Sequence, residues 1–222
     1  MTNSERTLRV GAARDAIEMT SHAIAEHLRR ADQTLAQVIS HVGLLKIEPS
    51  RLPHPFQTLF HAIVAQQIST RAADTIVRRV HALFPRHRIL RPDEILAIPE
   101  VQLRLAGLSF KKIAAVKDLA DQALSGALPT VKRLLTLTDD EVRTCLTRIR
   151  GIGVWTADMF LIFHLQRPNV LPLSDHALKR SVMLAYELPE LPSNEELLVI
   201  SERWRPFRSV ACRYLWRYLD SL

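Results

Sequence analysis

A glycine turn in the middle of the chain constrains the fold more than any other feature. Gly151-Ile152-Gly153 permits a tight turn that β-branched residues do not make, and an apolar spacing typical of a helix follows from Val154. A glycine turn that opens a helix presents backbone N–H groups, and with the helix dipole these bind phosphate without any side chain. Such a turn suits a nucleic-acid backbone whose base edges it leaves unread. A plain helix–helix turn gives the same pattern, so other motifs must support the interpretation.

The segment after this helix supplies a carboxylate. The helix is predicted to end near Arg167-Pro168, and an extended stretch then delivers Ser174 and Asp175 to the start of another helix. There the helix dipole and the nearby N–H groups favour an ionised carboxylate, so Asp175 is expected to stay charged at neutral pH and to be able to stabilise a developing cation. An ordinary N-cap is the alternative for either residue, and one role does not exclude the other.

Two further motifs accompany the turn and the acid. In chain order the four motifs are Gln66-Gln67-Ile68-Ser69, Gly151-Ile152-Gly153-Val154-Trp155-Thr156-Ala157, Leu171-Pro172-Leu173-Ser174-Asp175 and Trp204-Arg205-Pro206-Phe207-Arg208-Ser209. Together they resemble the helix-hairpin-helix DNA glycosylases, and among these the 3-methyladenine DNA glycosylase II type. The resemblance runs from about Pro53 to the C-terminus. It implies an enzyme of base excision repair that flips alkylated purines, of the 3-methyladenine and 7-methylguanine class, out of double-stranded DNA and excises them by hydrolysis.

The fold is predicted to be all-α. Helical apolar spacing recurs along the chain, and neither a convincing alternation of apolar and polar residues nor a long repeat is visible. A chain of 222 residues can bury a sizeable core, so we expect one compact unit, 1–222, with the helix-hairpin-helix glycosylase fold. Two packed helical lobes would flank an active-site cleft: approximately 1–55 plus 185–222 form one lobe, and approximately 56–184 form a central lobe with the hairpin at 139–166.

Charge and cysteine content narrow the class of protein. Lys and Arg number 30 against 23 Asp and Glu, and the net charge of +7 suits a polyanionic partner without proving one. Cys145 and Cys212 are too few to ligate an iron–sulfur cluster and lie in apolar helical patterns typical of buried thiols. We expect no cofactor. The sequence has neither a signal-peptide pattern nor a membrane-spanning apolar run, so we expect an intracellular protein, cytoplasmic and nucleoid-associated in a bacterium or nuclear in a eukaryote.

The polar loop Gln66-Gln67-Ile68-Ser69 lies between two predicted helices. By resemblance, this loop fills the gap that the extruded base leaves and touches the opposing strand. Ile68 and Ser69 are the two candidates for the inserted wedge. The alternative is a loop that only caps a helix end.

Other residues are candidates for phosphate contacts. The resemblance places Lys111 and Lys112 ahead of a helix near DNA, although two adjacent lysines are also common at a solvated helix start. Lys179 falls one turn past the acid and either meets a phosphate or forms a surface pair. By resemblance, the carbonyls around Gly151 and Gly153 can also surround a monovalent cation. No other metal site is expected, since the histidines show no metal-ligand spacing.

The expected chemistry follows from the substrate that the resemblance implies. A purine alkylated at N3 or N7 is positively charged and leaves readily, so the enzyme must mainly stabilise the sugar. Cleavage of the N-glycosidic bond builds oxocarbenium character, which a nearby carboxylate offsets in a water-poor pocket. Asp175 is the candidate for this role and for orienting the attacking water. Asp158 is expected to be a polar-face or lobe-bridging residue.

Two tryptophans are candidates for the base pocket. Trp155 stands where the bifunctional relatives carry a Schiff-base lysine, and an indole cannot replace that amine, so we predict hydrolysis without strand cleavage. Trp155 and Trp204 resemble aromatic positions around the base pocket, where stacking on a cationic ring gives selectivity for alkylated bases. For Trp204 a place in the core is the alternative, because the C-terminal segment is rich in aromatic residues.

Two other functions stay open. One is a non-catalytic helix-hairpin-helix module that only binds DNA, and the other is a glycosylase for another damaged base. Binding alone requires Gly151 and Gly153 but not Asp175, so the matching acid argues against the first. The missing lysine argues against an oxidised-guanine enzyme. The expected partner is double-stranded DNA containing alkylated bases, with no membrane, and we expect a monomer.

Overall fold

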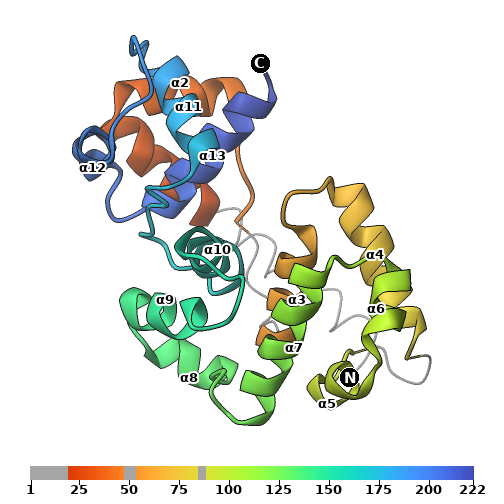
Figure 1. Cartoon of the computed structure of the whole chain (residues 1–222). Helices are drawn as coiled ribbons and strands as arrows, with labels where there is room; N and C mark the ends of the chain where they lie inside the picture. Colours follow the sequence, from red (N-terminus) through yellow and green to blue (C-terminus); the bar gives the residue numbers. More distant parts are fainter. Residues whose placement is uncertain (1–19, 48–53, 85–88) are drawn as a thin grey trace, which may run out of the picture. The chain divides into compact units, whose positions relative to one another are not determined.

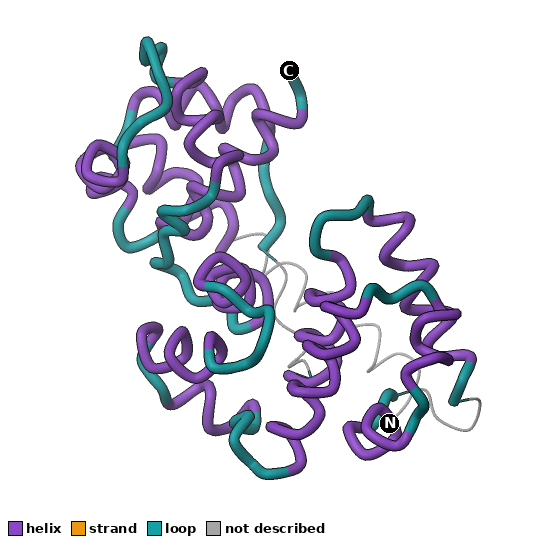
Figure 2. The backbone as a smooth tube through the Cα atoms, viewed as in Figure 1, coloured by secondary structure: helices purple, strands orange, loops and turns teal. Residues whose placement is uncertain are grey.

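The computed structural model describes residues 20–47, 54–84 and 89–222 (Figure 1). Within these ranges the regular structure is helical and no strand occurs (Figure 2). The all-α prediction is therefore confirmed. None of the helices in these ranges combines the length and the apolar character that a bilayer crossing requires.

The chain divides into two units, and each is described by itself. Unit 1 comprises residues 1–50 and 166–222, and unit 2 comprises residues 51–165. The prediction assigned the stretch up to residue 184 to the central lobe, whereas the structure places residues 166–184 in unit 1. The reason is that α11 (His176–Ala185) packs against α13 (Arg208–Asp220). The cleft expected between the lobes stays a prediction.

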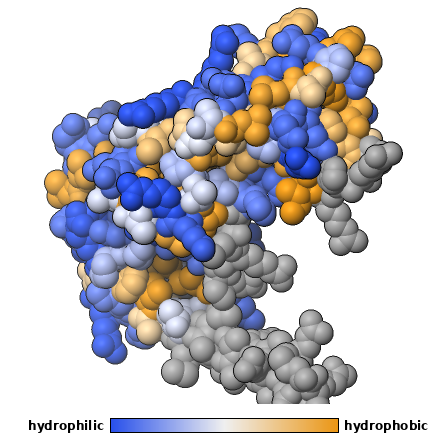
Figure 3. Space-filling model, turned by 90° about the horizontal axis from the view of Figure 1, so that it is seen from below, coloured by the Kyte–Doolittle hydropathy of each residue, from blue (hydrophilic) through white to orange (hydrophobic). Residues whose placement is uncertain are grey.

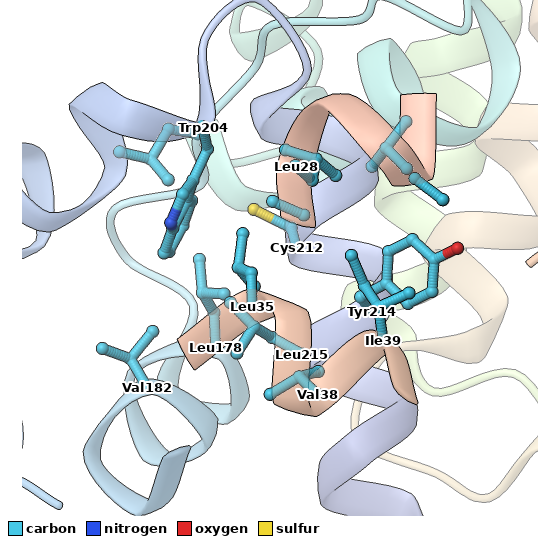
Figure 4. Close-up of a cluster of buried hydrophobic side chains, with 14 of the residues drawn as sticks. Leu28, Leu35, Val38, Ile39, Leu178, Val182, Trp204, Cys212, Tyr214 and Leu215 are labelled. Carbon is cyan, nitrogen blue, oxygen red and sulfur yellow. The ribbon is translucent and has the colours of Figure 1, made fainter. Parts of the chain in front are cut away.

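Unit 1 is built from helices at both ends of the chain. Its elements are a helical segment over residues 20–31, α2 (Gln33–Val42), α11, α12 (Asn194–Ser201), the 3₁₀ turn η2 (Glu202–Trp204) and α13. Their apolar faces meet in one core, shown in Figure 4, that includes Leu28, Leu35, Ile39, Leu178, Trp204, Cys212 and Leu215. Each large apolar side chain buried in this way stabilises the fold by about 1.5–3 kcal/mol. Cys212 is buried as predicted, whereas Cys145 in unit 2 is only half-buried.

Unit 2 is a continuous stretch of short helices. In order they are α3 (Pro55–Ala65), α4 (Thr70–Ala82), α5 (Pro92–Ala97), α6 (Glu100–Ala106), α7 (Phe110–Leu124), α8 (Val131–Thr136), α9 (Asp139–Thr147), α10 (Val154–Met159) and the π-helical turn η1 (Phe160–His164). The longest of them, α7, packs against both α3 and α5 (Figure 1). It does so through a buried stripe that contains Ile113, Val116 and Leu119.

The start of the hairpin is fixed by a capping box. The Thr138 hydroxyl accepts from the backbone N–H of Glu141 at 3.2 Å, and the Glu141 carboxylate accepts from the Thr138 N–H at 2.7 Å. This reciprocal pair satisfies two N–H groups that a helix start otherwise leaves unbonded. The capping box therefore marks the start of α9.

Some apolar side chains reach the surface. Val101, Leu105 and Phe110 on α6 and α7 are each more than half exposed, and the Arg104 guanidinium lies 4.4 Å from the centre of the Phe110 ring. The face drawn in Figure 3 likewise carries hydrophobic and hydrophilic patches side by side. Scattered exposed apolar groups of this kind are common on soluble folds.

Candidate active site

The hairpin turn joins α9 to α10, and its two glycines have different roles. Gly151 has a φ of +80°, in the left-handed region, and a Cβ at this position would lie 3.2 Å from the Ala115 Cβ. Gly153 is the N-cap residue of α10 with a φ of −94° and a ψ of 175°, and a Cβ there would meet nothing within 4 Å. The backbone conformation therefore requires a glycine at 151, whereas Gly153 leaves open space beside the start of α10.

An ion pair fastens the two helices of the hairpin together. The Arg143 guanidinium contacts Asp158 through Nε and Asp140 through Nη1, each at 2.7 Å. Asp158 is buried, and this burial raises the pKa of its carboxyl, an effect that the hydrogen bond and charge of Arg143 oppose. Asp158 was expected on a polar face or between the lobes. It instead pairs inside the hairpin, where α9 supplies its partner.

The polar loop connects α3 to α4, and its residues differ in backbone conformation, hydrogen bonding and exposure. Gln67 has a φ of +58°, an uncommon conformation for a residue other than glycine. The Ser69 hydroxyl accepts from the Ala72 N–H at 3.3 Å and so caps α4. Ile68 leaves 37% of its surface exposed. Of the two wedge candidates, Ser69 is thus engaged within the protein, and Ile68 offers an apolar side chain to solvent.

A short hydrogen-bond chain ties this loop to the hairpin turn. Lys112 Nζ donates to the carbonyls of Val64 at 2.6 Å and Gln66 at 2.9 Å, and Gln66 Nε2 donates to the Gly151 carbonyl at 2.8 Å. Burial lowers the pKa of Lys112. The ammonium group of Lys112 thus binds the end of α3, and its contact with a phosphate stays a prediction. The neighbouring Lys111 is exposed.

A cavity of about 420 Å³ opens in unit 2 beside the hairpin. Its volume lies within the range of small-molecule sites, about 300–1,000 Å³. The side chains around it include Thr58, Leu59, Gln67, Trp155, Met159, Phe160 and His164. The structure thus brings together Gln67 and Trp155, which the sequence analysis had assigned to different tasks. Trp155 is 45% exposed, so its indole is accessible.

His164 lines the same cavity, and the sequence analysis missed it. Its ring centroid lies 5.5 Å from that of Phe160. Burial, and secondarily the charge of His61, lower the pKa of His164, so its imidazole is neutral near pH 7. A search for metal-ligand spacing could not find this residue, since its position depends on the π-helical turn η1.

The proposed acid lies in unit 1 at the start of α11. Asp175 is 6% exposed, and its carboxylate accepts from the Leu178 N–H at 2.5 Å and from Trp216 Nε1 at 3.0 Å. The N-cap predicted for this position is present. Trp216, on α13, is half-buried and was not among the predicted site residues. Lys179 lies one turn after the acid, and its backbone N–H donates to the Asp175 carbonyl at 3.1 Å.

Trp204 lacks the exposed side-chain surface that a residue of the base pocket needs. Its side chain is completely buried, and its indole Nε1 donates to Asp32 at 3.2 Å and to the Tyr186 hydroxyl at 3.1 Å. Asp32 also caps α2 by accepting from the Thr34 N–H at 2.9 Å. The base-pocket prediction for Trp204 is therefore wrong: core packing and a buried hydrogen-bond cluster account for this residue.

Metal ligands do not gather in the part of the chain that the structure describes. Over residues 20–47, 54–84 and 89–222, no group of three or more His, Cys, Asp or Glu side chains is arranged to hold a metal ion. The monovalent cation predicted at the hairpin carbonyls stays a prediction. One of these carbonyls, that of Gly151, accepts from Gln66.

Known proteins share both the sequence pattern and the fold. Residues 60–206 match the HhH-GPD superfamily base excision DNA repair proteins. The chain is 32% identical over 203 residues to DNA-3-methyladenine glycosylase 1 of Schizosaccharomyces pombe, covering 90% of this chain and 88% of that protein. The solved structure of the S. pombe 3-methyladenine DNA glycosylase Mag1 in complex with abasic DNA has a TM-score of 0.79 at 31% identity, covering 87% and 95% of the two chains. The DNA-3-methyladenine glycosidase of Bacillus halodurans has a TM-score of 0.78 at 33% identity, covering 89% of each.

Proposed function

Because this chain belongs to the HhH-GPD superfamily of base excision DNA repair proteins, we propose that it is a DNA glycosylase that hydrolytically removes alkylated bases from DNA. The names of its relatives and the solved complex of one of them with abasic DNA support this assignment. The single observation that carries it within this chain is the buried Asp175 carboxylate, oriented by the N–H groups of Leu178 and Trp216.

A buried carboxylate of this kind suits glycosidic bond cleavage. Removing a carboxylate from water is costly unless donors hold it, as N–H groups do at Asp175 and, in a structural role, at Asp32. Asp175 differs from Asp32 because it ends the motif in which the resemblance to the glycosylases places the catalytic acid. In the proposed reaction the bond between base and sugar breaks, and the sugar gains oxocarbenium character. Asp175, held by two fixed donors, offsets this charge as it develops and orients the water that attacks the sugar.

The substrate class is inferred from the cavity beside Trp155. Purines alkylated at N3 or N7 carry a positive charge, and an accessible indole attracts a stacked cation through its ring face. We assign the flipped base to this cavity and propose that the preferred substrates are 3-methyladenine and 7-methylguanine in double-stranded DNA. By resemblance, Trp155 stands where strand-cleaving relatives carry a lysine, so we expect abasic sites as products, without strand cleavage.

DNA contacts are assigned to the hairpin turn and the polar loop. The open space at Gly153 leaves room for a phosphate to approach the backbone, and exposed Lys111 lies on the same unit. Ile68 is assigned the role of the wedge, because its apolar side chain is exposed whereas the Ser69 hydroxyl caps α4. We propose that the protein acts as a monomer.

Base release from methylated DNA tests this function. DNA methylated at purine N3 and N7 is incubated with the parent protein and with Asp175→Asn, and strand breaks are scored before and after alkali. The parent is expected to release methylated bases and to leave alkali-labile sites without direct breaks, and the variant should lose most of this activity while still binding DNA. Asp220→Asn, at the exposed end of α13, is the matched control and should retain activity. Tight DNA binding by the parent without any base release would instead identify a binding module.

A further inference from the structure

We propose that His164 sets the charge selectivity of the cavity beside Trp155: its neutral imidazole admits a positively charged base, and its protonation excludes such a base while still admitting an uncharged one. The inference rests on the proposed function, since it takes the cavity as the place of the flipped base. It makes His164 a specificity-determining residue that needs no contact with the bond that breaks.

The geometry places His164 where it can act in this way. The backbone N–H of Leu165 donates to the Phe160 carbonyl at 3.0 Å, an i to i+5 hydrogen bond that marks the π-helical turn. This turn follows directly on α10, which carries Trp155, and both side chains face the same cavity. His164 is the last residue of this turn, and π-helical turns are frequent at functional sites.

The composition of the cavity makes His164 decisive. Among the described side chains that line it, His164 is the one whose ordinary pKa lies near neutrality. The others are aliphatic, aromatic, amide, hydroxyl or thioether groups, which stay uncharged. The charge that a base meets within this lining therefore depends on one imidazole. Beside partly buried apolar side chains, two positive charges repel each other more strongly than in bulk solvent.

The surroundings of His164 keep it neutral under ordinary conditions. Burial is the larger cause of its lowered pKa, and His61 on α3 is the charged neighbour that contributes. His61 in turn lies 3.4 Å from Asp74 on α4, measured from Nε2 to Oδ1. Protonation of His164 thus requires a more acidic solution than an exposed histidine does. Below that pH the cavity gains a positive charge.

The ratio of two release rates isolates this effect. Single-turnover release is measured from pH 5 to pH 8 on duplexes that differ only in one base, the cationic 7-methylguanine or the uncharged hypoxanthine. In the parent protein, the rate for 7-methylguanine relative to hypoxanthine should fall as the pH drops, approaching about tenfold per pH unit below the pKa of His164. Partial unfolding at low pH slows both reactions, so it largely cancels from the ratio.

Three variants separate the imidazole from other acid-sensitive groups. His164→Gln keeps a polar side chain without a titrating proton, and its ratio should change less than about twofold over the same range after correction for titration of the bases. His164→Lys should disfavour the cationic base already at pH 8, without abolishing release of hypoxanthine. His61→Gln removes the facing charge and should move the fall in the ratio to higher pH. Circular dichroism confirms that each variant is folded.

The outcomes distinguish this inference from the function on which it rests. If the parent releases both bases and His164→Gln shows the same change of the ratio with pH, the inference is overturned and the glycosylase assignment stands. If only 7-methylguanine is released, its own pH profile tests the inference. The fall in its release rate at low pH must then occur at a lower pH in His164→Gln than in the parent, and an unchanged profile overturns the inference. Release of neither base at any pH would overturn the proposed function and the inference together.

Discussion

The Asp175 carboxylate and the Trp216 indole form the smallest unit of the proposed chemistry. Trp216→Phe keeps an aromatic ring and removes the N–H that donates to Asp175 at 3.0 Å. A hydrogen bond to a charged group contributes about 1.5–3 kcal/mol, so we expect base release to slow by roughly 10- to 100-fold. Single-turnover release measures the effect. Trp204→Phe serves as the comparison: it should lower the melting temperature, because it breaks the buried cluster with Asp32 and Tyr186. Equal release rates for the parent and Trp216→Phe would remove Trp216 from the site.

These two tryptophans also show the limit of the sequence at this scale. The sequence pattern predicted Asp175 and its N-cap, because a capping residue at a helix start is a local feature. It did not single out Trp216, because local spacing does not reveal which side of a helix faces the acid, and the resemblance pointed to Trp204 for the base pocket. That choice depends on how α13 packs against α11, contacts that are distant in sequence. His164 was missed for a related reason: it lies in a π-helical turn, where regular α-helical spacing does not predict which way a side chain points.

At the scale of the hairpin, the two glycines provide a matched pair of substitutions. Gly151→Ala places a side chain at a φ of +80° and 3.2 Å from the Ala115 Cβ, and we expect a loss of about 1–3 kcal/mol in the free energy of unfolding. Gly153→Ala meets no atom within 4 Å, and its stability should change by less than about 1 kcal/mol. If Gly153 admits a phosphate, this variant will nevertheless bind DNA more weakly. Denaturant unfolding measures the stability of each variant, and DNA titration measures its affinity for DNA. Equal stabilities of the two variants would contradict the different roles given to Gly151 and Gly153.

The contact between α7 and the end of α3 leads to a prediction about the polar loop. Lys112→Met removes the donor to the carbonyls of Val64 and Gln66, which should cost about 1–3 kcal/mol of stability and loosen the loop that holds Ile68. Lys111→Met, one position earlier on an exposed side chain, should leave the melting temperature unchanged. The fluorescence of a 2-aminopurine placed beside the lesion reports base flipping. A normal flipping signal in Lys112→Met would show that the loop needs no such support.

Sequence patterns were most informative at this scale of helices and turns. The capping box of α9 and the glycine turn after it could be read locally, because caps and turns depend on a few adjacent residues. The contact of Lys112 with the end of α3 could not be predicted locally, because its partners Gln66 and Val64 lie 46 and 48 positions away in the sequence. Adjacent lysines at a helix start look alike in sequence whether they face solvent or a neighbouring helix.

For the whole molecule, the lowered pKa of His164 predicts how stability depends on pH. An unfolded chain binds a proton at His164 near its ordinary pKa of 6.5, whereas the folded protein resists protonation because partial burial of the ring disfavours its charged form. The contribution to stability is therefore complete above pH 6.5 and is lost as the pH falls towards the folded pKa. We expect His164→Gln to show a weaker loss of stability between pH 7 and pH 5 than the parent. Urea unfolding at several pH values checks this, and parallel curves for both proteins would contradict it.

The order in which the two units occur along the chain has a consequence for synthesis. Unit 2 is one uninterrupted stretch, whereas unit 1 joins residues 1–50 to residues 166–222. A ribosome therefore releases the whole of unit 2 before α11 and α13 exist, and the apolar faces of residues 20–31 and α2 must wait without their partners. During this interval these apolar faces lack the helices that later cover them, and transiently exposed apolar surface of this kind is prone to aggregation.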